Sequence, residues 1–74
     1  MDINKFIKPG KDAVVEIEEV EYLLDDNAAT SIARGDKKIA LIQLFDRRSY
    51  LFDIEIVVKA IEAGGIVDYL DKRS

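Results

Sequence analysis

The stretch that decides the fold is residues 37–53, which read KKIALIQLFDRRSYLFD. From Ile39 to Phe45 every residue except Gln43 is apolar, a pattern typical of a strand that must be covered on both faces. The polar residues 46–49 interrupt this run, and Tyr50-Leu51-Phe52 resumes it. Two apolar runs joined by a short polar break predict an antiparallel hairpin.

The chain after the hairpin has the pattern of an amphipathic helix. Asp53 is placed to cap a helix over 55–63, and Gly64-Gly65 ends it. One face of this helix carries apolar residues, which are Ile56, Val57, Ala60 and Ile61. We expect this face to pack on the hairpin. The tail over 66–70 fits either a final turn or a short strand.

The chain before the hairpin alternates apolar and acidic residues with period two. The alternation slips by one residue at Glu18-Glu19, which predicts a bend or bulge between two short strands. A helix from Glu16 to Leu24 is the alternative. The residues after it, Asp25-Asp26-Asn27, are typical of a helix start, and a short helix over 28–34 would end at Gly35.

These elements predict one α+β domain over residues 1–74, with a small antiparallel sheet of three to four strands and a C-terminal amphipathic helix packed on it. A chain of 74 residues buries a thin core. Such a core rarely supplies more than about 3–5 kcal/mol without a disulfide, a metal or a partner subunit. Because one short helix cannot cover both faces of the apolar strand, we expect a homo-oligomer.

The composition excludes several classes of function. The chain has no Cys and no His, the usual ligands of zinc, haem and iron–sulfur clusters and the commonest catalytic nucleophile and base. The glycines form no phosphate-binding pattern, and the acidic residues do not follow a calcium-loop spacing. We therefore expect a binding protein rather than an enzyme, with no metal and no cofactor. The lack of Cys and of any signal-peptide or membrane-span pattern predicts a cytoplasmic protein without membrane contact.

The charge is divided along the chain, although the net charge is −4. Residues 12–26 hold seven acids and no base, whereas residues 34–48 hold five bases and two acids. The basic residues are candidates for binding nucleic acid: Arg34, Lys37, Lys38, Arg47 and Arg48. The acidic residues are candidates for binding a basic protein surface: Glu16, Glu18, Glu19, Glu21, Asp25 and Asp26, with Asp12 also in this stretch.

Several short motifs lie along the chain: Gly10-x-Asp12-x-Val14-Val15, Glu19-Val20 and Leu23-Leu24-Asp25 in the first part, and the apolar runs 38–42 and 49–52 in the later part. In this order they resemble the extracellular-matrix regulatory (Rem) family of small bacterial transcription regulators. The chain departs from the family at 53–55, where the family has serine, proline and serine. The resemblance implies a ring-forming regulator that binds double-stranded DNA through arginines near the hairpin.

Two functions follow as predictions. The first is a small oligomeric regulatory protein that binds DNA through the basic residues. The second is an acidic protein-interaction module or inhibitor, of the kind that mobile elements encode as nucleic-acid mimics. Acids on an exposed strand imitate spaced phosphates when they face one way, and Glu16, Glu18 and Glu21 nearly do so.

Overall fold

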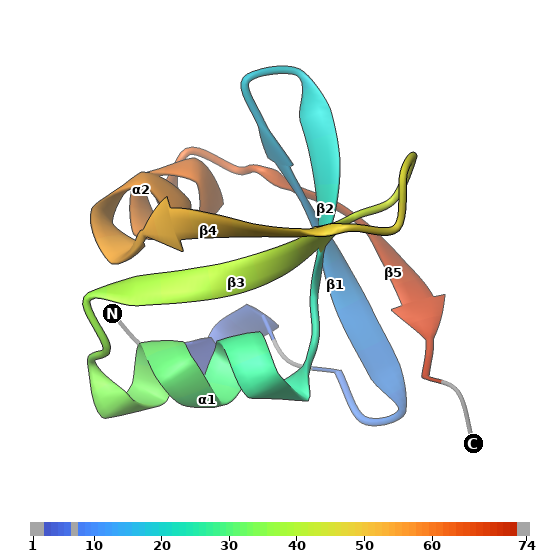
Figure 1. The fold of residues 1–74 in the computed structure, drawn as a ribbon. Coiled ribbons are helices and arrows are strands. Elements are labelled where there is room, and N and C mark those ends of the chain that lie inside the picture. The colour runs from blue at the N-terminus through green and yellow to red at the C-terminus, as the bar shows by residue number, and fades with distance from the viewer. Residues whose placement is uncertain (1–2, 7, 73–74) are drawn as a thin grey trace.

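The structure is a computed structural model that describes residues 3–6 and 8–72. Five strands form one antiparallel sheet in the order β4-β3-β2-β1-β5 (Figure 1). The strands are β1 (Lys11–Ile17), β2 (Val20–Leu24), β3 (Lys38–Gln43), β4 (Ser49–Asp53) and β5 (Ile66–Asp71). The helices are the 3₁₀ turn η1 (Ile3–Phe6), α1 (Asp26–Arg34) and α2 (Ile54–Glu62). The predicted α+β class is confirmed, but the sheet has five strands and not three to four.

The two short strands predicted on either side of Glu18-Glu19 are confirmed, but the chain reverses there in a tight hairpin turn instead of a bend or bulge, and the alternative helix over 16–24 is wrong. Ile17 pairs with Val20, and Glu18-Glu19 make a two-residue turn. Both turn residues have positive φ, 51° at Glu18 and 68° at Glu19. This is the turn geometry that matches the twist of a hairpin, although Asn-Gly is its usual sequence. The one-residue slip in the pattern marks this reversal of the chain.

The short helix after β2 is confirmed, and its ends follow the predicted capping chemistry. The Asp25 carboxylate accepts a hydrogen bond of 2.9 Å from the Ala28 amide at the helix N-terminus. Gly35 takes a left-handed φ of 77°, and its N–H bonds back to the last turn. Ala28 and Ile32 are the buried residues of α1, so the helix turns one face to the sheet.

The β3–β4 hairpin is confirmed, with Ile42 opposite Ser49 and Lys38 opposite Asp53. Within one chain β3 is covered on one face only, and cover of its other face by a second copy stays a prediction. Ile39 and Leu41 are buried, whereas Ala40 between them is exposed. On β4 the neighbour of Ala40, Leu51, is 67% exposed. Alternation along a strand therefore puts one face in the core and leaves the other open.

The second helix is confirmed, and the predicted burial of its apolar face is confirmed in part. Val57 and Ile61 are buried in the core, and Ala60 packs partly against it. Ile56 is 45% exposed, so its predicted burial is wrong. Asp53 stands at the N-cap position, but its side chain makes no capping bond. It pairs instead with Lys38 across the hairpin, at 3.3 Å.

The last element is a strand, so the prediction of a C-terminal helix is wrong. After α2 the chain reverses at Gly64, which has a φ of 82°, and β5 pairs antiparallel to β1. The pairing runs from Lys11 opposite Asp71 to Val15 opposite Ile66, with a shift at Val14/Val15. This long-range pairing makes β5 the outer strand of the sheet, next to β1.

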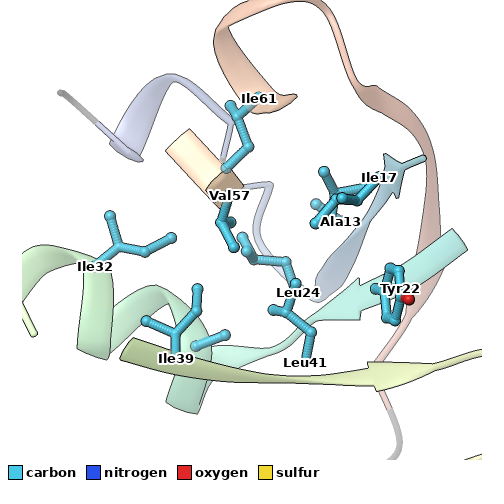
Figure 2. Packing of buried hydrophobic residues seen from close by; sticks show 11 residues of the cluster. Ala13, Ile17, Tyr22, Leu24, Ile32, Ile39, Leu41, Val57 and Ile61 are labelled. Carbon is cyan, nitrogen blue, oxygen red and sulfur yellow. The ribbon is translucent and has the colours of Figure 1, made fainter. Parts of the chain in front are cut away.

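A single cluster of buried side chains lies on one face of the sheet, and both helices cover that face (Figure 2). Ile39 and Leu41 from β3 meet Ile32 from α1 and Val57 from α2 there. Tyr22 adds edge-to-face contacts with Tyr50 and Phe52. In residues 3–6 and 8–72 no helix lies on the opposite face. Among the described residues no helix has the length and apolarity to cross a membrane.

Candidate functional site

The five basic residues predicted to bind nucleic acid lie at two ends of β3. Arg34, Lys37 and Lys38 lie where α1 ends and β3 begins, and Arg47 and Arg48 lie in the loop where β3 ends. The structure does not join them into one patch.

Two residues of the first group are already paired. Arg34 makes an ion pair of 2.6 Å with Asp36, and this hydrogen bond raises the pKa of Arg34 and lowers the pKa of Asp36. Lys38 pairs with Asp53, as described above. Because paired cations attract phosphate less, this end of the molecule is a weak candidate site.

The six acids predicted to bind a basic surface are also divided, but four of them converge. Glu16 stands directly opposite Glu21 in the β1–β2 hairpin, and Glu18-Glu19 form its turn. All four are exposed, and we call them the acidic hairpin. In Figure 1 the end of this hairpin stands clear of both helices. Like charges directly opposite on a hairpin destabilise it, and so do left-handed conformations at non-glycine residues. The acidic hairpin is therefore not explained by stability.

The remaining two acids, Asp25 and Asp26, lie at the other end of β2, where they line a groove of about 510 Å³. We call it the aspartate groove, and its lining also includes Asp12, Asp71, Arg47 and Lys72. Many of its charges are used internally. Asp25 caps α1, Lys72 pairs with Asp26 at 2.6 Å, and Lys11 pairs with Asp71. The hydrogen bond to Asp26 raises the pKa of Lys72, and burial raises the pKa of Asp12. These pairs give the aspartate groove a structural role.

A groove of about 460 Å³ runs beside the acidic hairpin, between it and the β3–β4 loop. We call it the hairpin groove. Three glutamates give it negative charge, and three apolar side chains give it a hydrophobic part. Its lining residues are Glu16, Glu19, Val20, Glu21, Gln43, Leu44 and Phe45. A site with these two properties suits a segment that carries both positive charge and apolar side chains.

Phe45 is the functional candidate that the sequence did not predict. It was expected to belong to a covered strand, but it lies in the β3–β4 loop and is 93% exposed. Four other large hydrophobic residues are exposed in the described part of the chain, all less so. Its place directly before Asp46-Arg47-Arg48 is the one signal that could have located it in a turn.

The loop that carries Phe45 is held by hydrogen bonds on both sides. Gln43 N–H donates to the Arg48 carbonyl and Arg47 N–H to the Gln43 carbonyl, both at 2.9 Å. Asp46 accepts from the Arg48 amide at 3.0 Å and from the Tyr50 hydroxyl. The Tyr50 hydroxyl lowers the pKa of Asp46, so this acceptor is ionised at neutral pH. These hydrogen bonds restrain the loop that carries Phe45, and such restraint reduces the entropy lost on binding.

No group of three or more acidic side chains in the described part of the chain is arranged to hold a metal ion. Comparisons with protein-family models, curated proteins and solved structures found no match. The function must therefore be argued from the surface of this molecule alone.

Proposed function

We propose that this protein is an interaction module that binds a basic segment of another protein through the acidic hairpin and Phe45. The observation that carries the proposal is the exposure of Phe45, 93%, on a hydrogen-bonded loop beside three glutamates. Aromatic side chains are enriched at protein interfaces, where polar residues form the rim.

The strained turn supports the same proposal. A two-residue turn with positive φ favours Asn-Gly, and each non-glycine residue in this conformation costs about 1–2 kcal/mol. Glu18 and Glu19 occupy the turn in spite of this cost and in spite of the charges of Glu16 and Glu21 nearby. Strained residues cluster at functional sites, so the conformation of this turn supports the proposal.

The test uses a fluorescently labelled lysine-rich peptide and measures its binding by anisotropy. Phe45→Ala removes the anchor, and losing the burial of one aromatic side chain weakens binding by about 1.5–3 kcal/mol, or roughly 10- to 100-fold. The double change Glu18→Asn and Glu19→Gly weakens binding by about 0.4–2 kcal/mol, because each exposed ion pair contributes about 0.2–1 kcal/mol. The same double change stabilises the fold, since it supplies the residues that the turn favours.

The matched control is Glu55→Gln with Glu62→Gln, which removes two exposed negative charges from α2. This pair lowers the net negative charge by the same amount as the turn variant but leaves the acidic hairpin intact. We expect it to bind the peptide within about twofold of the unaltered protein, a difference below 0.5 kcal/mol. Equal weakening by both double variants would show a non-specific charge effect and would contradict the proposal.

A second candidate function is DNA binding by an assembled form of the protein. It is favoured by one observation: Arg47 and Arg48 are exposed and make no ion pair within the described residues. Repeated copies of this loop in an oligomer would form a track for phosphates. The test is binding of duplex DNA at about 50 mM salt, where phosphate contacts are strongest. Arg47→Ala with Arg48→Ala should abolish DNA binding and leave peptide binding unchanged.

A further inference from the structure

β4 is the last strand at one end of the sheet, and within residues 3–6 and 8–72 its one neighbour is β3 (Figure 1). The Gln43 amide donates to the Arg48 carbonyl at 2.9 Å, so that carbonyl faces β3. Backbone groups alternate in direction along a strand, so those of Tyr50 and Phe52 also face β3. The backbone groups that point out of the sheet belong to Ser49, Leu51 and Asp53.

The strand at the other end of the sheet, β5, is protected from further pairing. The Lys72 amide donates to the Gly10 carbonyl on the β1 side at 2.9 Å, so the Tyr69 amide points out of the sheet. The Asp68 carboxylate accepts from that amide at 2.8 Å, and the pairing of β5 with β1 contains a register shift. Charged side chains and bulges on an outer strand hinder its pairing with another chain. β4 pairs without a register shift, and its central residue, Leu51, is 67% exposed.

Two copies of β4 complement each other when they lie antiparallel about a two-fold axis at Leu51. Each Leu51 then exchanges both backbone bonds with its counterpart, and each Asp53 amide donates to the Ser49 carbonyl of the other copy. The Asp53 carbonyl takes no part, because Asp53 is the N-cap residue of α2 and its carbonyl accepts the first helical bond. In this register the Ser49 hydroxyl stands opposite the Asp53 carboxylate, and no like charges stand opposite each other.

The side chains of the uncovered sheet face, which carries Ala40 and Leu51, fit the same register. Ala40 pairs with Leu51 in the β3–β4 hairpin, and both are exposed. With the two Leu51 residues side by side, an apolar row runs from Ala40 of one copy across the joint to Ala40 of the other.

The charges at the two ends of β4 favour the antiparallel direction. The loop before β4 carries Arg47 and Arg48, which are exposed and make no ion pair within the described residues. The helix after β4 carries Glu55 in its first turn, and Glu55 is also exposed. Antiparallel pairing places the arginines of each copy at the end where the other copy has Glu55. Complementary charges of this kind orient two partners as they associate.

We propose that two copies of this chain join at β4 and form one continuous sheet across a two-fold axis. The partner is a second copy because a single register pairs the free backbone groups, aligns Leu51 with itself and sets the arginines near Glu55. This joint lies at the edge of the sheet and does not cover its open face, and the tests below separate the two kinds of contact. The acidic hairpin belongs to β1 and β2, so the inference is independent of the proposed function.

The first test measures the dimer dissociation constant of variants by sedimentation. Leu51→Lys should weaken the dimer about tenfold or more, because it removes an apolar contact and sets two like charges opposite each other. Ala40→Lys is the matched control, which adds the same charge to the same face but one strand away from the joint. It should change the constant by about twofold or less. Equal weakening by both variants would show that the copies pack face to face, and would overturn the inference.

The second test mixes two variants and examines the two-fold register itself. Leu51→Lys and Leu51→Glu should each be monomeric at a concentration where the unaltered protein is a dimer. An equal mixture of the two should form a heterodimer, because opposite charges then face each other across the joint. Failure of the mixture to associate would overturn the inference, and so would an unaltered protein that stays monomeric.

Hydrogen exchange of the unaltered protein provides a measurement without any substitution. Raising the protein concentration should slow exchange at the Leu51 and Asp53 amides about tenfold or more, because both amides gain acceptors in the dimer. The Tyr50 and Phe52 amides already face β3 and should change less. Unchanged exchange at Leu51 over a range of concentration that populates the dimer would contradict strand pairing at β4.

Discussion

Gly65 is the position where a single methyl group should disturb the fold most. Its carbonyl accepts from the Glu16 amide and its amide donates to the Ala60 carbonyl, both at 2.8 Å. It therefore joins α2 to β1 at the base of the acidic hairpin. A Cβ atom on Gly65 would lie 2.4 Å from the Ala60 oxygen and 3.2 Å from the Glu16 oxygen. The first distance is far inside van der Waals contact, and both neighbours are backbone atoms.

We expect Gly65→Ala to destabilise the domain by about 2–4 kcal/mol. Relief of the clash requires a backbone shift, for which overpacking data give about 1–3 kcal/mol, and the loss of one hydrogen bond adds about 1 kcal/mol. This is comparable to the 3–5 kcal/mol that a core of this size supplies. Gly64→Ala is the control, because a Cβ there meets no atom within 4 Å and its φ of 82° is the one source of strain. That strain costs about 1–2 kcal/mol.

Urea unfolding followed by circular dichroism measures both variants. The expected order of stability is the unaltered protein first, Gly64→Ala second and Gly65→Ala last. A Gly65→Ala variant as stable as Gly64→Ala would refute this account of how α2 is joined to β1.

Three further predictions concern the core, the acids and the assembly. Ile61→Asp should unfold the domain, because Ile61 is 1% exposed and burial of an unpaired carboxylate costs several kcal/mol. Ile56→Asp on the same helix should leave thermal unfolding nearly unchanged, because Ile56 is 45% exposed. Asp12→Asn should stabilise the protein at pH 7 and not at pH 3: burial raises the pKa of Asp12, so its ionised form destabilises the native state as pH rises through that pKa. Equal urea midpoints at pH 7 would contradict this. Light scattering at micromolar concentration should show a species larger than the 8.4 kDa monomer, because the sheet face that carries Ala40 and Leu51 is uncovered in one chain. Leu51→Lys should shift this species towards the monomer, and a monomeric unaltered protein would count against the expectation.

The elements set by local chemistry could be predicted from the sequence. The Asp25 carboxylate and Gly35 fix the two ends of α1, and both act within a few residues of their own position. The β3–β4 hairpin also depends on neighbouring runs of sequence. The glutamates of the acidic hairpin form a visible run of negative charge in the sequence, because they are consecutive or nearly so.

The elements set by distant contacts could not be predicted. β5 is a strand because β1 offers it an edge more than fifty residues earlier in the chain, and the tail alone is compatible with either helix or strand. The turn at Glu18-Glu19 lacks the glycine or asparagine that normally marks such a turn. Phe45 continues an apolar run in the sequence, and its exposure follows from where the β2–β3 pairing stops. The hairpin groove exists because of these three features together.

The most direct test of the central claim is to map the binding surface by NMR. The unaltered protein, labelled with ¹⁵N, is titrated with the lysine-rich peptide, and amide shifts are followed for the whole chain. We expect the largest shifts at Glu16–Glu21 and Gln43–Phe45, and we expect Phe45→Ala to require a higher peptide concentration for the same shifts. Largest shifts in the aspartate groove, at Asp25, Asp26 and Asp71, would contradict the claim.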